Sequence, residues 1–315
     1  MIFLKNDELF GQVSAMLDAG LSITKALEIA SRRGKSNTRN GWRQVIADIN
    51  NGSTLTAALR ASKLKLSRID ICIIASGERS GHLTESFKLI ADLHLIKTQT
   101  CNLLISGLTL PVLQFHIIAF LLQIAAVILG KISIFQYFIN VFIILFLFMY
   151  LPAIIVIWMA HYSGREGHFR FIIDRLLLKI PLLGPALKDL AFARYCQGFY
   201  ALYSAGIPMP VCADLSLDLC NNAVVKAMLK NGGKIARDGY PVSQGFSPDT
   251  PSDFISIWQS GEQSGRLFDT LQHLYTKRQD QAKENLKVFG KLVPQFMMLA
   301  IIFIVALIII SSRTA

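Results

Sequence analysis

Charged residues are scarce in this chain of 315 residues, at 17% against about 25% in an average soluble domain. They are missing from three stretches rather than thinned throughout: no Asp, Glu, Lys or Arg occurs in residues 103–130, 132–160 or 292–312. The remaining blocks, residues 1–102 and 161–291, carry 51 of the 53 charged residues. Together with a mean hydropathy of +0.45, this distribution excludes a single soluble enzyme domain.

Each charge-free stretch is long enough to cross a membrane, because about 20 apolar residues span the hydrocarbon core of a bilayer. We therefore predict three transmembrane helices, at 103–130, 132–160 and 292–312. The first two would form a tight hairpin around Lys131, so both charged blocks share one side of the membrane. Eleven Lys and Arg residues flank the spans on the side of the blocks, against Lys131 and Arg313 on the other. Because basic flanks favour the cytoplasm, both blocks are predicted to be cytoplasmic.

Motifs of enzymes, metal sites and nucleic-acid-binding proteins are also missing. The six histidines form no HExxH motif and no recognisable Ser/His/Asp constellation. Gly34-Lys35-Ser36 is not the end of a P-loop, because Ile29 stands where that motif needs a glycine. The net charge of +11 is spread along the chain rather than gathered into a basic stripe, and the five cysteines contain no CxxC pair. We expect no catalytic residue, no cofactor, no metal, no nucleic-acid partner, and free buried thiols.

An internal repeat is the most informative feature of the sequence. Gly77-Glu78-Arg79-Ser80-Gly81-His82-Leu83 in the first block matches Gly261-Glu262-Gln263-Ser264-Gly265-Arg266-Leu267 in the second at five of seven positions. Two further matches lie upstream in the same order: residues 17–21 with 203–207, and residues 51–55 with 238–242. Three matches in register indicate that one domain has been duplicated.

The local pattern of each copy is helical. Apolar residues recur at three- and four-residue steps before and after Gly20, and Gly206 holds the matching position in the second copy. Glycine fits the left-handed conformation that ends a helix, so both are predicted helix corners. No alternating strand pattern of useful length occurs. The predicted fold class is all-α, with two homologous cytoplasmic helical bundles, residues 1–102 and 161–291, interleaved with three transmembrane helices.

The repeated motif Gly-Glu-x-Ser-Gly-x-Leu has two interpretations. Its glycines end one helix and its Ser or Glu side chain can satisfy free amides at the start of the next, which makes a structural corner. The same corner can also be a docking surface, where an exposed carboxylate meets a basic group of a partner. A metal site is a less well supported interpretation, because each copy offers one carboxylate without a second ligand at suitable spacing. The candidate residues are Gly77, Glu78, Ser80, Gly81 and Leu83 in the first copy and Gly261, Glu262, Ser264, Gly265 and Leu267 in the second.

The duplicated helical domains, the repeated motif and the three charge-free stretches resemble the type II secretion F family. These are the inner-membrane platform proteins of type II secretion systems, type IV pili and competence pili. Asp174, Pro181 and Gly184 resemble the family's segment that leads into its second domain. The resemblance implies a non-enzymatic protein of the bacterial inner membrane, with both soluble domains cytoplasmic and the C-terminus periplasmic.

The resemblance also implies partners and a mechanism. A hexameric secretion ATPase would engage the cytoplasmic domains, while the membrane face handles pilin-like subunits and contacts other inner-membrane assembly proteins. Nucleotide-driven movement would pass through the helical domains to the spans and so couple the ATPase to fibre assembly. We also expect the chain to form a homo-oligomer within the lipid bilayer.

An oligomeric membrane transporter or channel subunit is the alternative function. It is suggested by three polar residues within the predicted spans, His116, Gln123 and Asn140. Such groups also form hydrogen bonds between membrane helices, and His116 is the only one of the three that can titrate. A membrane-bound enzyme is a third alternative, but no constellation of residues supports it.

Overall fold

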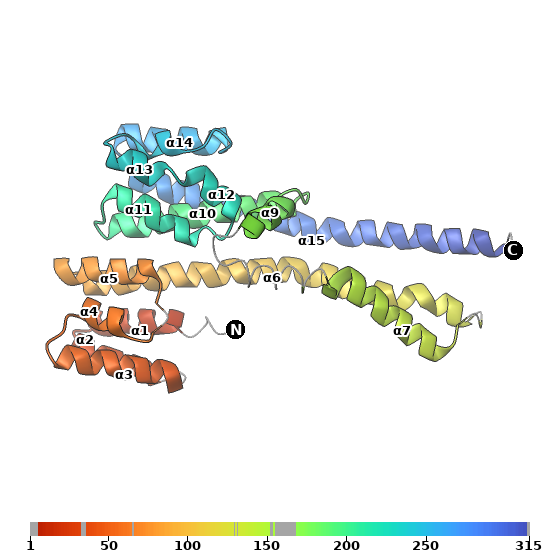
Figure 1. Ribbon diagram of the computed structural model, residues 1–315, viewed down its shortest axis with the longest axis horizontal. Helices are drawn as coiled ribbons and strands as arrows, with labels where there is room; N and C mark the ends of the chain where they lie inside the picture. The colour runs from red at the N-terminus through yellow and green to blue at the C-terminus, as the bar shows by residue number, and fades with distance from the viewer. Residues whose placement is uncertain are drawn as a thin grey trace. The chain divides into compact units, whose positions relative to one another are not determined.

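The computed structural model describes residues 6–32, 36–64, 66–128, 130, 132–151, 154 and 168–313. Every regular element formed by these residues is helical (Figure 1), so the predicted all-α class is confirmed for the described part of the chain. Two compact units are present. The first contains residues 1–100, 190–221 and 225–279, and the second contains residues 101–189, 222–224 and 280–315.

The first repeat opens the first unit and is drawn in red to orange in Figure 1. Its helices are α1 (Asn6–Asp18), α2 (Ile23–Ser31), α3 (Ser36–Asn50), α4 (Leu55–Ala61), α5 (Arg68–Ser80) and the start of α6 (Leu83–Ile128). Helices adjacent in sequence contact each other from α1 to α5. The core gathers around Phe10, whose ring lies 6.3 Å from Trp42 and 6.0 Å from Phe87. The apolar three- and four-residue periodicity therefore marks the buried face of each helix.

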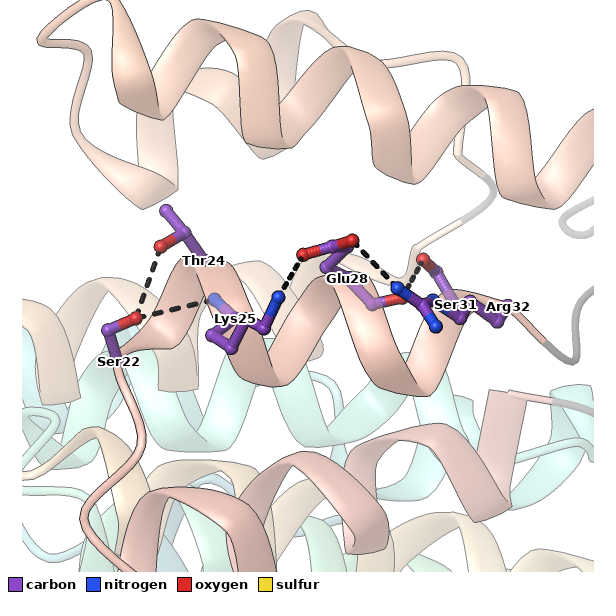
Figure 2. Close-up of polar contacts among 6 residues, drawn as sticks. All are labelled: Ser22, Thr24, Lys25, Glu28, Ser31 and Arg32. Atoms are coloured by element: carbon purple, nitrogen blue, oxygen red, sulfur yellow. Dashed lines mark hydrogen bonds and ion pairs between the residues drawn. The ribbon is translucent and has the colours of Figure 1, made fainter.

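The outer surface of α2 shows the polar counterpart of this periodicity. Glu28 accepts hydrogen bonds from the Lys25 ammonium and the Arg32 guanidinium, both at 3.0 Å (Figure 2). These bonds lower the pKa of the exposed Glu28 carboxyl. Leu27 and Ala30 on the same helix are buried. Helix α2 is therefore amphipathic, with one face in the core and the other in water.

Gly20 and Gly206 lie where the sequence predicts helix corners. Gly20 follows α1 with a φ of 83°, and Gly206 follows α10 (Leu183–Ser204) with a φ of 72°. Ser22 then caps α2 by accepting a hydrogen bond from the Lys25 amide at 3.4 Å (Figure 2). In the second repeat Pro208 occupies the capping position of α11 (Met209–Ser216). Both corners use the left-handed conformation that glycine adopts at little cost.

The second repeat keeps the order of the first, with some of its elements replaced. After α10 and α11 come η2 (Leu217–Leu219), α12 (Ala223–Leu229), α13 (Gly232–Arg237), η3 (Val242–Gly245), α14 (Ser252–Ser264) and α15 (Leu267–Arg313). By sequence offset, α14 corresponds to α5 and has the same length of 13 residues. The α12–α13 pair occupies the place of α3, and the single 3-10 turn η3 occupies the place of α4.

The core of the second repeat is built from aromatic side chains around Trp258. The Trp258 ring lies 5.2 Å from Phe199, 5.2 Å from Phe246 and 5.7 Å from Phe254. The Phe199 and Phe246 rings meet it edge to face, an arrangement that adds to the stability from buried area alone. The repeats also touch each other within the first unit, where the Ser76 hydroxyl in α5 donates to the Ala205 carbonyl at 2.6 Å.

In the second unit, α6 pairs with α7 (Ile134–Leu145) and with the π-helical turn η1 (Phe146–Tyr150) that continues it. The His116 ring bonds the Val112 carbonyl at 2.8 Å through Nδ1 and the Tyr150 hydroxyl at 2.9 Å through Nε2. The Tyr137 hydroxyl donates to the Phe120 carbonyl at 2.9 Å. His116 is thus engaged in helix pairing, which is the role that polar groups in membrane helices also have. The side chain of Gln123 lies outside the described residues.

Among the residues that the structure describes, no helix is both long enough and apolar enough to cross a membrane. Residues 152, 153 and 155–160 of the predicted span 132–160 lie outside the described residues, as does Lys131 at the predicted hairpin tip. The three spans therefore stay a prediction of the sequence.

Candidate functional site

The first glycine of each motif lets two helices approach closely. A Cβ atom on Gly77 in α5 would lie 2.8 Å from the Ser86 Cβ in α6 and 2.9 Å from the His82 carbonyl oxygen. A Cβ atom on Gly261 in α14 would lie 2.7 Å from the Thr270 Cβ in α15. Because protein interiors do not tolerate such short separations, each motif needs a residue without a side chain at this position.

The second glycine of each motif ends its helix. Gly81 and Gly265 have φ values of 80° and 68°, in the left-handed region. The Gly81 amide bonds the Gly77 carbonyl, and the His82 amide bonds the same carbonyl at 2.8 Å. The Gly265 amide bonds the Glu262 carbonyl at 3.4 Å. These bonds satisfy carbonyl groups that a helix end otherwise leaves open, and the chain turns directly into α6 or α15.

The Glu78 carboxylate clamps the beginning of α4. Its Oε1 accepts the Leu55 amide at 2.5 Å, and its Oε2 accepts the Thr56 amide at 2.9 Å and the Thr56 hydroxyl at 2.6 Å. The first amides of a helix have no partner within the helix and carry its positive dipole end. A carboxylate from α5 therefore supplies both hydrogen-bond acceptors and a favourable charge to α4.

The Glu262 carboxylate makes the equivalent clamp in the second repeat. The Ser243 amide lies 3.4 Å from Oε1 and 3.3 Å from Oε2, and the Ser243 hydroxyl donates to Oε2. Ser243 is in the 3-10 turn η3, at the repeat position of Thr56. Both copies thus join an acid in the motif helix to an amide and a hydroxyl of the element that precedes it.

These clamps correct two expectations. The motif carboxylates are not exposed, because Glu78 and Glu262 are half-buried and turned toward their own domains. The amides they satisfy also belong to the preceding element rather than to the helix that follows the corner. The physical reason is that α4 packs against α5 and η3 packs against α14, which brings the amides of the preceding element within reach of the motif carboxylate.

The motif serines also act within their own helices. The Ser80 hydroxyl donates to the Ser76 carbonyl at 2.9 Å, and the Ser264 hydroxyl donates to the Ser260 carbonyl at 2.7 Å. Serine commonly makes such bonds to the residue four positions earlier. These hydroxyls therefore close the last turn of α5 and α14 and do not cap the next helix.

The outward side of each corner is formed by exposed residues around the second glycine. They are Arg79, Ser80, Gly81 and His82 in the first repeat, and Gln263, Ser264, Gly265 and Arg266 in the second. Leu83 is half-buried and Leu267 is buried, so they anchor the start of the following helix. We call these exposed residues the rim of each corner. A docking surface would expose the rim, and the glutamates would support it from inside the domain. A role in binding a partner stays a prediction.

A match to a family model accounts for both repeats together. The family described as type II secretion system (T2SS), protein F matches residues 9–130 and 195–312. Both copies of the motif and both helix-corner glycines lie within these ranges. The chain belongs to the type II secretion system protein F family.

The curated relatives of this chain include proteins named for pilus assembly and proteins named for type II secretion. A type IV pilus assembly protein PilC of Thermus thermophilus is 25% identical, over 87% of this chain and 73% of that protein. PilC of Pseudomonas aeruginosa is 26% identical, over 87% of this chain and 80% of that protein. A type II secretion system protein F of Aeromonas hydrophila is 22% identical, over 93% of this chain and 82% of that protein. The resemblance inferred from the motif is therefore confirmed.

Asp174 in α9 (His168–Leu177) forms a third clamp that the motif did not reveal. Its Oδ2 accepts the Ala223 amide, at the start of α12, at 2.6 Å. Burial raises the pKa of the Asp174 carboxyl, and the Ala223 hydrogen bond and the Arg170 guanidinium, 3.9 Å away, offset part of this effect. The family resemblance pointed to Asp174 but not to its partner, which lies 49 residues further along the chain.

A polar joint also ties each motif helix to the long helix after it. In the first repeat the His94 Nε2 atom lies 3.1 Å from the Asp70 Oδ1 atom. In the second, Arg278 donates to Asp253 at 2.7 Å and lies over the rings of Phe192 and Phe254. Neither joint was predicted from the sequence, although His94 and Arg278 share the repeat offset that aligns the two motifs.

Among the described residues no group of three or more His, Cys, Asp and Glu side chains is arranged to hold a metal ion. Cys196, Cys212 and Cys220 are buried free thiols, as expected, and Cys72 is a half-buried free thiol. Burial raises the pKa of Cys212 and of Cys220 to about 12 each, so these sulfur atoms stay protonated and unreactive at neutral pH.

Proposed function

We propose that this chain is an inner-membrane platform protein of a type IV pilus or type II secretion machine. Membership of the family over both repeats carries the proposal, and relatives named for pilus assembly and for type II secretion support it. The role is that of a scaffold and transmitter rather than an enzyme. Its partners would be a hexameric secretion ATPase, pilin-like subunits, other inner-membrane assembly proteins and further copies of the chain.

The membrane part of the proposal places spans at 103–130, 132–160 and 292–312. Its support is the absence of charge from these stretches and the eleven basic residues that flank them on one side. Both repeats would face the cytoplasm and the C-terminus would face the periplasm.

The coupling part of the proposal uses the two motif corners as the points where the ATPase pushes. Helix α6 starts at Leu83 and α15 starts at Leu267, each immediately after a corner. They continue unbroken for 46 and 47 residues into the predicted first and third spans, which corresponds to about 70 Å at 1.5 Å per residue. The glutamate clamps and the close glycine contacts stiffen each corner. A displacement applied there would therefore be transmitted along a helix rather than absorbed by a loop.

The first test is affinity purification of the full chain from membranes in mild detergent, with mass spectrometry of the attached proteins. A secretion ATPase together with pilin-like subunits is the expected result. Recovery of the intact chain without either partner, under conditions that preserve a known relative's complex, would contradict the platform role.

The second test asks whether the corners bind the ATPase. Arg79→Glu combined with Arg266→Glu reverses one exposed charge on each rim and leaves both glutamate clamps in place. Arg43→Glu combined with Lys234→Glu is the matched control, because these residues are exposed and belong to α3 and α13, outside both motifs. We expect the rim pair to reduce recovery of the ATPase while the control pair retains it. Equal recovery from both would leave the motif as a structural corner only.

A further inference from the structure

One side of α9 exposes apolar and basic side chains together. Ile172 is 41% exposed, Leu176 is 59% exposed, and Ile180, just beyond the helix, is 37% exposed. Arg175 and Lys179 are exposed between them. Large aliphatic groups rarely remain in water in such a row without a partner, so this stripe needs an occupant.

The opposite side of α9 is fixed to the protein by Asp174. This residue is only 8% exposed, and its carboxylate accepts the Ala223 amide at 2.6 Å. With 3.6 residues per turn, positions 172 and 176 lie across the helix from position 174, and position 175 lies about 100° to one side. The Asp174 clamp therefore sets the rotation of α9 and directs the stripe outward.

The turn after α9 restrains the helix further. Leu182 adopts a φ of 65°, which is unfavourable for a residue with a side chain. A Cβ atom on Gly184 would lie 2.6 Å from the Leu178 carbonyl carbon and 2.9 Å from its Cα atom. This contact leaves no room for another residue type at Gly184. The stripe is therefore presented in a defined orientation by a tight connection to α10.

The chemistry of the stripe identifies an anionic bilayer surface as its occupant. A helix that lies in the headgroup region places apolar residues at the acyl boundary and lets Lys and Arg reach lipid phosphates. Neither Arg175 nor Lys179 makes an ion pair within the part of the chain that the structure describes, so both charges are available. A purely apolar partner surface would leave these two cations without counter-charges.

We propose that α9 is an interfacial anchor on the cytoplasmic surface of the membrane. Ile172 and Leu176 enter the boundary between headgroups and acyl chains, and Arg175 and Lys179 bind the phosphates of anionic lipids. The inference rests on the proposed span at 132–160, which would deliver the chain to the membrane surface shortly before α9 begins. The anchor then holds the entry to the second repeat at a fixed height above the bilayer.

The test uses the full chain in nanodiscs that contain either zwitterionic phosphatidylcholine alone or a mixture with anionic phosphatidylglycerol. A nitroxide is attached to Leu176→Cys, to Gln263→Cys on an exposed corner as the aqueous reference, and to Ala306→Cys in the third predicted span as the membrane reference. Signal from the native cysteines is subtracted with the labelled, unsubstituted chain. Collisions with oxygen report lipid, and collisions with a water-soluble nickel chelate report water.

In anionic nanodiscs we expect the label at position 176 to gain oxygen collisions and lose nickel collisions relative to position 263. Neutral lipid, or Arg175→Gln combined with Lys179→Gln, should reduce this protection. Lys230→Gln combined with Lys234→Gln removes two exposed charges elsewhere and should not change it.

Four results would overturn the inference. If position 176 matches position 263 in anionic lipid, α9 lies in water. If the label is shielded from both reagents, a protein surface covers the stripe. If its protection ignores lipid charge and the Arg175/Lys179 change, these two residues do not bind lipid phosphates. If position 306 is also in water, the membrane part of the proposed function fails together with the anchor. Failure at position 176 with position 306 in lipid leaves the platform proposal standing.

Discussion

The two repeats preserve their corners and differ around them. Each has a glycine at the close helix contact, a second glycine in the left-handed conformation, and a glutamate that reaches back to the preceding element. By contrast, the single helix α3 corresponds to the broken pair α12–α13, and α4 corresponds to a 3-10 turn. Duplication has therefore retained the groups that set the angle between two helices, while the outer elements have changed freely.

The glutamate clamps show that a change in the neighbouring element can weaken an interaction without removing it. The start of α4 offers Glu78 two backbone amides at 2.5 and 2.9 Å. The shorter turn η3 offers Glu262 one amide, at 3.3 and 3.4 Å from its two oxygens. Shorter hydrogen bonds to a charged acceptor are stronger. We therefore expect the first repeat to depend more heavily on its clamp.

Substitution of the glycine at each close helix contact should produce the largest difference in unfolding free energy between the repeats. Gly77→Ala brings a methyl group against the Ser86 side chain and the rigid His82 carbonyl, whereas the nearest neighbours of a Gly261→Ala methyl all belong to the Thr270 side chain. Overpacking of this kind costs about 1 to 3 kcal/mol. We expect about 3 kcal/mol for Gly77→Ala and about 1 kcal/mol for Gly261→Ala, measured by denaturant unfolding of the purified chain.

Gly11→Ala is the control for these variants. Gly11 is also in a helix, but the nearest atom to its added methyl group would be the Ala91 Cβ at 3.8 Å, an ordinary contact. This change should be neutral or slightly stabilising, because alanine is the better helix former. Equal destabilisation by all three substitutions would show that helix glycines, rather than the motif contacts, account for the effect.

Neutralising the Glu78 and Glu262 carboxylates should produce the next largest loss of stability. Glu78→Gln keeps the shape of the side chain but replaces a charged acceptor, with an expected local cost of about 2 kcal/mol, against about 1 kcal/mol for Glu262→Gln. Amide hydrogen exchange measures each site separately. The first variant should accelerate exchange at Leu55 and Thr56, and the second at Ser243. Uniform acceleration over both repeats would indicate global unfolding instead of a lost clamp.

The polar joint of the second repeat should lose part of its stabilising effect in acid. Burial raises the pKa of Asp253, but the hydrogen bond and charge of Arg278, with Lys277, outweigh burial and lower that pKa below its usual value of 3.8. The pair therefore stabilises α14 against α15 above pH 3.8 and loses this contribution as pH falls through the lowered pKa. Asp253→Asn should remove this acid-dependent loss, which peptide-resolved exchange between pH 5 and pH 3 would detect. An unchanged pH profile would mean that the ion pair adds nothing.

Labelling of the thiols should perturb the structure least, and it should distinguish the thiol of the first repeat from those of the second by their reactivity. Burial raises the pKa of Cys212 and of Cys220 to about 12 each and that of Cys196 well above its usual range. A maleimide should therefore reach half-buried Cys72 of the first repeat before these three. Complete labelling of Cys196, Cys212 and Cys220 should need denaturant. Rapid labelling of all four in the folded chain would show that the second repeat opens readily.

Much of the corner could be predicted from the sequence, because the decisive constraints are local. Gly81 and Gly265 end helices through their own backbone conformations, and the apolar steps around Gly20 follow from the helical period. The partners of the glutamates could not be predicted in this way. Thr56 lies 22 residues from Glu78, and Ser243 lies 19 residues from Glu262. No local rule connects them, although the aligned hydroxyls at 56 and 243 were a signal available in the repeat.

By itself, the sequence determined that the chain is helical and duplicated, that charge is absent from three long stretches, and that its motifs place it in the type II secretion F family. These properties follow from periodicity, composition and residue identity, which need no fold to be recognised. The tertiary structure decided that the motif carboxylates face inward, that Asp174 fixes one side of α9, and that the opposite side presents Ile172 and Leu176 outward. Side-chain direction depends on which backbone amides a fold brings within hydrogen-bond distance, and only the packed chain sets that distance.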